Sequence, residues 1–209
     1  MIKRIIFDLD NTLIPWDKDW NVYIKKAFEF FNINITEEEH IALLNTVANY
    51  EKKYNMYDKY LMTKELGKTL NKEISIDVLE KWIEYLKDCY TYDETVEDVL
   101  KYLSNKYELV VLTNWFTEQQ KTRLEKAGYL KYISEVIGTD KVLNKPNKEV
   151  FLKAINPLKK EECVMIGDDV NTDIKGAMNI DLNYIFLNIN GIKTEYKSIK
   201  NLEELKEIL

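Results

Sequence analysis

The stretch Ile5-Ile6-Phe7-Asp8-Leu9-Asp10-Asn11-Thr12 decides the fold that we expect for this chain. Its apolar run ends abruptly in acid, which is typical of a short buried strand in a parallel sheet. Ligands of open α/β sheets lie just beyond the carboxyl ends of the strands. Asp8 would leave the strand at that edge, and Asp10 would point to the same side if the chain stays extended. Two carboxylates about 4 Å apart repel by roughly 4 kcal/mol at an effective dielectric of about 20, so we expect a cation there.

Taken alone, this motif has a simpler interpretation as a strand followed by a solvated polar turn. A calcium-binding loop is excluded, because Leu13 stands where such a loop requires glycine and Asp19 stands where it requires a bidentate glutamate. The rest of the chain has to decide between the solvated turn and a functional site.

The size and composition of the chain predict one sizeable core with a small additional lobe. The chain has 209 residues, of which 45% are hydrophobic and 32% charged, as in a soluble globular protein. Its 30 basic and 36 acidic side chains give a net charge of −6, which argues against a protein that binds nucleic acid polymers. A nucleotide substrate is not excluded.

Sequence features favour a cytoplasmic location. No apolar run approaches the length that spans a bilayer, and the N-terminus lacks a signal-peptide pattern. Cys89 and Cys163 are far apart in sequence and are expected to be reduced, structural residues. The single histidine, His40, is expected on a helix surface. Histidine-based catalytic triads and zinc sites with several histidine ligands are therefore not expected.

Residues 17–89 show helical periodicity without strand signals, and we expect them to form an all-helical cap domain. Within this block Thr36 and Glu39 form a capping-box signature, and Asp77 is expected to cap a later helix. Residues 1–16 and 90–209 would form the core domain.

Strands and helices alternate from residue 95 onward, which predicts right-handed βαβ units and a parallel sheet. The fold class is therefore α/β, with a Rossmann-like parallel sheet and an inserted helical cap. The expected strands of this part are residues 109–112, 133–137, 163–166 and 184–187, and the expected helices are residues 95–103, 117–127, 148–155, 171–178 and 201–209.

The predicted strand ends carry polar residues that could form one site, because the ends of parallel strands face one crevice. Oxygen ligands there would select a hard cation, most simply Mg²⁺, while an amine and a hydroxyl would hold phosphate oxygens. Each residue also has a simpler interpretation: a turn cap, a surface lysine, or an incomplete calcium loop near residue 169. The set comprises Asp8, Asp10, Thr12, Thr113, Asn114, Lys145, Asp168 and Asp173.

In these motifs the chain resembles the haloacid dehalogenase superfamily over its whole length, within the subfamily I that carries a helical C1 cap. The resemblance rests on Asp8-Leu9-Asp10-Asn11-Thr12, Thr113, Lys145 and Gly167-Asp168 with Asp173, in that order. It implies a Rossmann-like core, a cap inserted after the first motif, and phosphoryl transfer. Dehalogenating members lack the second acid of the first motif, which this chain has at Asp10.

The resemblance also implies a role for each motif residue. Asp8 would be the nucleophile, and Asp10 the general acid and then the general base. Mg²⁺ would be bound by Asp8, the backbone carbonyl of Asp10, and Asp168. Phosphate would be held by Thr113, the Asn114 backbone and Lys145, with Asp173 orienting Lys145 or a metal-bound water.

A weaker resemblance to the nucleotidase group of this family rests on residues 112–120 with 123–124 and Gly128, on residues 145–147 with Phe151, and on the closing helix 199–209. That group commonly has glycine where this chain has Trp115, and this difference puts the transfer of its substrate in doubt. Most cap aromatics are expected to be core residues, but Trp16 or Trp115 is a candidate to stack on a flat leaving group.

The sequence therefore predicts a Mg²⁺-dependent phosphomonoesterase acting on a small phosphorylated metabolite, with a nucleoside monophosphate as one candidate. A sugar-phosphate phosphatase and a phosphomutase are the alternatives within the enzymes. A non-catalytic scaffold with the same fold is the alternative of another class, and the intact acids speak against it. A monomer or weak homodimer without membrane contact is expected.

Overall fold

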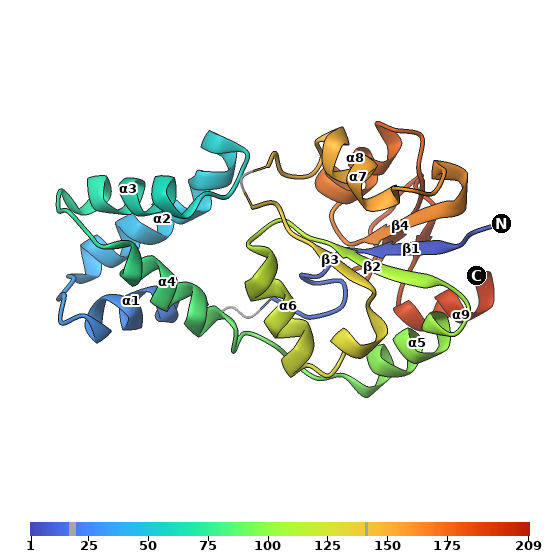
Figure 1. The fold of residues 1–209 in the computed structure, drawn as a ribbon, viewed down its shortest axis with the longest axis horizontal. Coiled ribbons are helices and arrows are strands. Elements are labelled where there is room, and N and C mark those ends of the chain that lie inside the picture. The colour runs from blue at the N-terminus through green and yellow to red at the C-terminus, as the bar shows by residue number, and fades with distance from the viewer. Residues whose placement is uncertain (17–19, 141) are drawn as a thin grey trace.

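A computed structural model gives the positions of residues 1–16, 20–140 and 142–209. In these ranges the chain forms a parallel sheet with helices on both faces, and a group of helices at one end of the molecule (Figure 1). The strands are β1 (Arg4–Phe7), β2 (Glu108–Leu112), β3 (Glu135–Ile137), β4 (Cys163–Gly167), β5 (Asn183–Leu187) and β6 (Ser198–Ile199).

The strand that carries the opening motif lies in the middle of the sheet. The strand order is β3-β2-β1-β4-β5-β6, and all neighbouring pairs are parallel. Phe7 at the end of β1 lies opposite Val111 on one side and Ile166 on the other. The chain fills one half of the sheet before it crosses to the other, so the topological switch point lies between β1 and β4, where α/β proteins bind ligands.

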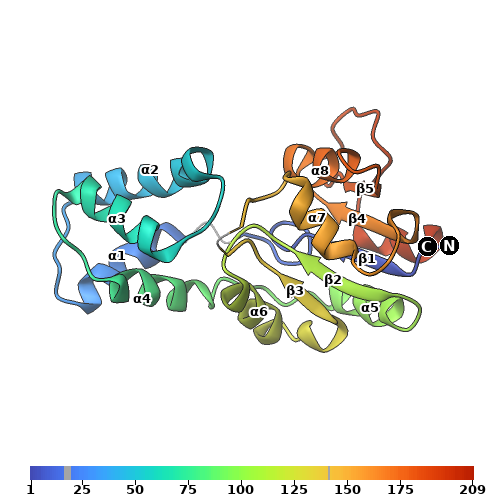
Figure 2. The same ribbon diagram turned by 45° about the horizontal axis from the view of Figure 1, so that its top comes forward.

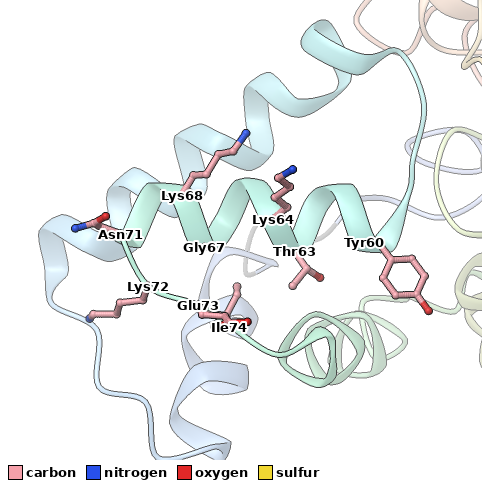
Figure 3. A pocket seen from close by; sticks show the side chains of 9 residues that line it. All are labelled: Tyr60, Thr63, Lys64, Gly67, Lys68, Asn71, Lys72, Glu73 and Ile74. Atoms are coloured by element: carbon pink, nitrogen blue, oxygen red, sulfur yellow. The ribbon is translucent and has the colours of Figure 1, made fainter.

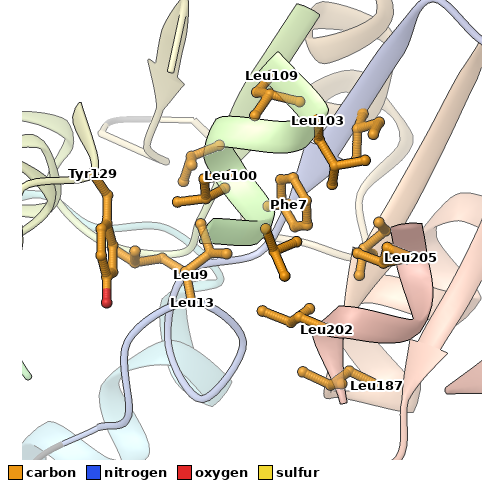
Figure 4. Close-up of a cluster of buried hydrophobic side chains, with 14 of the residues drawn as sticks. Phe7, Leu9, Leu13, Leu100, Leu103, Leu109, Tyr129, Leu187, Leu202 and Leu205 are labelled. Carbon is orange, nitrogen blue, oxygen red and sulfur yellow. The ribbon is translucent and has the colours of Figure 1, made fainter. Parts of the chain in front are cut away.

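Alternate residues of the central strands supply two separate cores, as expected for a sheet that is covered on both faces. Ile5 and Phe7 point toward the helices α5 (Glu94–Ser104) and α9 (Leu205–Ile208), in the cluster that Figure 4 shows. Ile6 points to the other face, toward α7 (Lys148–Ile155) and α8 (Lys175–Met178). Figure 2 shows these helix pairs on opposite sides of the strands.

Four helices form a lobe beside the carboxyl ends of the strands, separate from the sheet in both views (Figures 1 and 2). Their apolar side chains make their own buried cluster, which also includes Phe116 from the sheet domain. The domain boundaries at residues 16/17 and 89/90 stay predictions, and the first of them involves residues 17–19, outside the described residues. The lobe consists of α1 (Trp20–Phe30), α2 (Glu37–Tyr54), α3 (Lys59–Leu70) and α4 (Ile76–Leu86).

The helix of the sheet domain that follows β2 is α6 (Thr117–Lys126), and it ends before Gly128, whose φ is +78°. Shorter turns are η1 (Leu130–Tyr132), η2 (Lys160–Glu162), η3 (Val170–Ile174) and η4 (Leu202–Glu204).

Local sequence signals predicted several helix ends correctly. Thr36 caps α2, and its hydroxyl and the Glu39 carboxylate form the reciprocal capping box. The prediction for Asp77 was wrong, because Ser75 is the N-cap of α4 and Asp77 lies in the first turn. His40 is not a surface residue: it is 8% exposed, and its Nε2 lies 2.9 Å from the carbonyl oxygen of Asn21.

The sequence was less informative where elements are very short. The expected strand at 133–137 begins only at Glu135, because Ile133 is the C-cap of η1 and its amide donates to the Leu130 carbonyl. The two-residue strand β6 was not predicted at all, and it is too short to show an alternating pattern. The helix expected at 171–178 divides into a π-helical turn and four α-helical residues, and the helix expected at 201–209 divides into a 3-10 turn and four α-helical residues.

In the part of the chain that the structure describes, both cysteines are buried and neither forms a disulfide. Among the described residues, no helix has the length and apolar character that crossing a bilayer requires.

Candidate active site

Three acids, Asp8, Asp168 and Asp173, lie close together at the topological switch point of the sheet. The Asp8 amide continues the strand pairing by donating to the Ile166 carbonyl at 2.8 Å, which fixes where its side chain leaves the sheet. Asp8, Asp168 and Asp173 each offer a carboxylate oxygen, and these oxygens all lie within 4.8 Å of one another. Thr12 donates from its hydroxyl to Asp168 at 3.3 Å. This set of hard oxygen donors suits a cation such as Mg²⁺.

Lys145 bridges two of these acids from a loop far away in sequence. Its Nζ lies 2.6 Å from Asp8 Oδ1 and 2.7 Å from Asp173 Oδ1. The lysine is 3% exposed, Asp8 7% and Asp173 1%, so this is a buried network rather than a surface ion pair. A buried charge of this kind is stable only when it is paired, which explains why all three groups come together.

The charges of the cluster are not balanced by the protein alone. Burial and then the nearby Asp8 charge raise the pKa of Asp168 to about 6. Burial likewise raises the pKa of Asp8 and Asp173, against the opposing effect of Lys145. Burial alone would lower the pKa of Lys145, but the charges of Asp173 and Asp8 outweigh it and raise the pKa. One ammonium group therefore pairs with two of the three carboxylates, and a bound divalent cation would relieve the repulsion that remains.

Gly167 is required at the end of β4 because Asp173 packs against its backbone. A Cβ at this position would lie 2.2 Å from Asp173 Oδ2, closer than any real contact. Asp173 also accepts from the Asp169 amide at 3.2 Å, within the turn η3. The absence of a side chain at Gly167 thus leaves the space that Asp173 occupies when it pairs with Lys145.

Asp10 is held by two side chains of α6. Gln120 donates from Nε2 to Asp10 Oδ2 at 2.8 Å, and Arg123 Nη1 donates to Asp10 Oδ1 at 2.5 Å. Both partners are fully buried, whereas the Asp10 side chain is 26% exposed. Arg123 also donates to the Cys89 carbonyl, in the segment that returns from the helical lobe. Asp10 is therefore fixed near the junction between the lobe and the sheet.

The two residues at the end of β2 lie beside this acid and the lysine. The Thr113 hydroxyl accepts from Gln120 Nε2 at 3.0 Å. The Asn114 side chain accepts from the Lys145 amide at 2.9 Å and donates to Glu51 Oε1 at 2.7 Å. Asn114 thus links the lysine loop to helix α2 of the lobe.

All predicted phosphate-binding and acidic residues line one pocket of about 240 Å³: Asp8, Asp10, Thr113, Asn114, Lys145, Asp168 and Asp173. Trp16 and Trp115 do not line this pocket. They line a second pocket of about 280 Å³ that shares Asp10 and Asn114 with the first. The structure therefore brings the whole predicted set to one end of the sheet, in two adjoining pockets.

A larger groove of about 550 Å³ lies on the outer side of α3, lined among others by Lys64, Lys68 and Lys72 (Figure 3). None of the strand-end residues lines it. Its size alone does not make it an alternative active site.

Comparison with known proteins identifies the family. The model of haloacid dehalogenase-like hydrolases matches residues 5–187. The chain belongs to this family. The matched region contains every strand-end residue described above.

Relatives of this haloacid dehalogenase-like hydrolase include phosphatases. A glyceraldehyde 3-phosphate phosphatase of Methanothermobacter thermautotrophicus is 25% identical, with 100% of both chains covered. A pyrimidine 5′-nucleotidase of Escherichia coli is 29% identical over 53% of each chain. Among solved structures, the magnesium-bound HAD-hydrolase YfnB of Bacillus subtilis superimposes with a TM-score of 0.71 at 22% identity, covering 100% of this chain and 98% of that one.

Four residues that line the two pockets or hold Asp10 were not assigned to the site from the sequence. Glu51 and Tyr57 belong to a lobe whose periodicity indicated only packing, and no local pattern marks them. Gln120 and Arg123 lie in the segment that resembles the nucleotidase group, where their helical spacing of three would have placed both on one face toward Asp10.

Proposed function

We propose that the protein is a Mg²⁺-dependent phosphomonoester hydrolase that works through an aspartyl-phosphate intermediate. The observation that carries this proposal is the buried Lys145, which bridges Asp8 and Asp173 at the switch point of the sheet, with Asp168 and Asp10 beside it. Such a site can bind a dianionic phosphate only if a further cation is present. The proposal accounts for each buried charge in the pocket.

The site residues take the roles that the family resemblance implies. Asp8, Asp168 and the backbone carbonyl of Asp10 would hold Mg²⁺, which supplies electrostatic stabilisation of the phosphate oxygens when bound. Lys145, the Thr113 hydroxyl and the Asn114 amide would bind the remaining oxygens. These groups are fixed by the sheet and by each other, so little reorganisation accompanies the reaction.

The chemistry needs two steps and two carboxylates. An oxygen of Asp8 attacks phosphorus and the bond to the leaving oxygen breaks, while protonated Asp10 gives its proton to that oxygen. Water then attacks the phosphorus of the aspartyl phosphate, and ionised Asp10 takes the proton. Inorganic phosphate leaves, and both acids return to their starting states.

The leaving group would occupy the second pocket, which adjoins Asp10. Trp16 and Trp115 line this pocket and could stack on a flat group. The names of the relatives span a small sugar phosphate and pyrimidine nucleotides, and a nucleoside monophosphate stays our sequence-based candidate. The aromatic lining favours a leaving group that can contact ring faces over a small polyol.

The site itself favours an enzyme over a non-catalytic scaffold, and release of inorganic phosphate distinguishes hydrolysis from a phosphomutase. A scaffold has no need for Lys145 to stay buried against two acids.

The sequence-based predictions of a cytoplasmic monomer or weak homodimer are open to test by fractionation and by light scattering.

Release of inorganic phosphate tests the proposal. The substrates would be nucleoside monophosphates, sugar phosphates and p-nitrophenyl phosphate, each with and without Mg²⁺. We expect Mg²⁺-dependent release that is lost in Asp8→Asn and retained in Asp98→Asn, which makes the same change at an exposed residue of α5. Release that survives in Asp8→Asn would refute the nucleophile, and no release from a folded protein would favour the scaffold.

A further inference from the structure

The second pocket is unusual in the number of aromatic rings that surround it. It has a volume of about 280 Å³ and continues into the catalytic pocket, because Asp10, Glu51 and Tyr57 line both. A leaving group bound at Asp10 would therefore extend into this space. The aromatic residues that line it are Trp16, Trp20, Tyr57, Trp82 and Trp115.

Trp115 is held in this pocket at a cost to its backbone. Its φ is +141°, in a region that favours glycine, so a bulky side chain there signals strain that the surroundings maintain. The ring lies edge-on to Tyr57, with centroids 4.6 Å apart, and to Trp82, at 5.8 Å. Strained positions cluster at binding sites. The aromatic surface formed by Trp115, Tyr57 and Trp82 is therefore a candidate ligand-binding surface.

The charged side chains that line the pocket are acidic, and the Arg123 guanidinium lies behind the lining, 5.0 Å from the centroid of the Trp16 ring. Two acids line it, Asp10 and Glu51, and none of its described lining residues is basic. The two acids differ in their partners, because Asp10 is paired with Arg123. Glu51 accepts from the neutral groups Asn114, Asn144 and Tyr57, and among the described residues it forms no ion pair. Its negative charge thus remains available to a ligand.

We propose that this pocket selects a cationic leaving group, so that the substrate is the phosphomonoester of an amino alcohol or of a quaternary ammonium alcohol. The inference rests on the proposed phosphatase function. Aromatic faces attract an ammonium ion, most strongly when it is desolvated, and rings around such a cation are a known recognition mode. Glu51 adds a full opposite charge at the mouth of the pocket.

Neutral and anionic leaving groups fit this pocket less well. A neutral nucleobase would stack on the same rings but would leave the Glu51 charge without a charged partner. A carboxylate on the leaving group would be repelled by Glu51 and Asp10. The order expected for kcat/KM is therefore cation, then neutral isostere, then anion.

The test compares two esters that differ in charge but not in shape. Choline phosphate and 3,3-dimethylbutyl phosphate would be assayed with Mg²⁺, and we expect kcat/KM to favour choline phosphate by at least about tenfold. In Glu51→Gln the ratio should fall toward one. Because both esters report on the same phosphate site, the ratio removes any effect of the variant on Asn114. Glu125→Gln, an exposed change on α6, should keep the wild-type ratio.

A second measurement covers the case in which Glu51→Gln does not fold. Choline should inhibit wild-type hydrolysis of p-nitrophenyl phosphate competitively, at a concentration about tenfold lower than 3,3-dimethylbutanol. Equal inhibition by the two alcohols, or equal kcat/KM for the two esters, would overturn the charge selection.

The same assays separate this inference from the proposed function. Mg²⁺-dependent hydrolysis of p-nitrophenyl phosphate that vanishes in Asp8→Asn, without a preference for the cation, would refute only the charge selection. Absence of hydrolysis of every ester would overturn both. A preference that persists unchanged in folded Glu51→Gln would refute the role of Glu51 and with it the inference.

Discussion

Lys145 is the residue on which the charge balance of the site depends most. It is the only basic residue among the described lining of the catalytic pocket, and it contacts Asp8 and Asp173. Breaking a buried ion pair by removing one partner costs roughly 3–5 kcal/mol, because the other charge stays buried without compensation. The lysine should therefore matter for folding as well as for phosphate binding.

We predict that Lys145→Met lowers both stability and phosphate release. The reason is that two buried carboxylates lose their ammonium partner and the phosphate loses a positive charge. Thermal unfolding should shift by several degrees and kcat/KM should fall by at least about 100-fold. Lys148→Met, an exposed change in α7, is the matched control. A folded variant with near wild-type activity would contradict the role of Lys145.

Gln120 and Arg123 define a second testable point at the residue scale. They donate hydrogen bonds to both carboxylate oxygens of Asp10. Among the described residues, neither forms a hydrogen bond with Asp8, Asp168 or Asp173. If they orient Asp10 as the proton donor, their loss should matter most for esters whose leaving group needs a proton.

We predict that Gln120→Met slows hydrolysis of alkyl phosphates about tenfold more than hydrolysis of p-nitrophenyl phosphate. General acid catalysis contributes roughly 10²–10⁴-fold, and a nitrophenolate leaves without it. Gln119→Met is the control, because Gln119 is equally buried but donates to the Leu86 carbonyl instead. Equal losses for both esters would indicate that Gln120 is merely structural.

At the scale of elements, the helical lobe depends on interactions that the sequence only partly reveals. The capping box at Thr36 could be predicted because all its atoms lie within one turn. The burial of His40 could not, because it depends on α1 packing beside α2 and offering the Asn21 carbonyl. The same holds for Glu65, a charged residue of α3 that is 8% exposed and sits between Lys53 and Lys68.

We predict that the Glu65 network makes folding stability depend on acidic pH. Hydrogen bonds from Lys53 and then Lys68 lower the pKa of Glu65 from 4.5 to about 2. Between these values the unfolded chain binds more protons, so this stability is present above about pH 4.5 and is lost as the pH falls toward 2. Urea midpoints measured from pH 6 to 2.5 should fall more steeply for wild type than for Glu65→Gln. Parallel curves would contradict the assignment.

At the scale of the whole molecule, the sheet edge was predictable and the second pocket was not. Each catalytic candidate follows a strand or opens a helix, and parallel strands end at one edge, so spacing alone brings Asp8, Thr113 and Asp168 together. The rings of the second pocket come from α1 and α4, from the segments before α1 and α3, and from the loop after β2. Their meeting depends on how the lobe packs on the sheet, for which the sequence has no periodic signal.

The partnership of Glu51 with Asn114 shows the same limit. These residues are 63 positions apart, and each has an ordinary local role as a helix residue or a turn residue. Only the position of α2 against the end of β2 makes Glu51 part of both pockets. The charge selection that we infer is therefore a property of the assembled molecule and not of any one motif.

Trapping of the phosphorylated enzyme tests the central claim most directly. The protein would be mixed with Mg²⁺ and a radiolabelled ester that it hydrolyses, quenched in acid within the first turnover, reduced with borohydride, and mapped by peptide mass spectrometry. We predict acid-stable label before reduction and, after it, reduction of the side chain at position 8, with neither in Asp8→Asn. Turnover without covalent label, or label on another residue, would contradict Asp8 as the nucleophile.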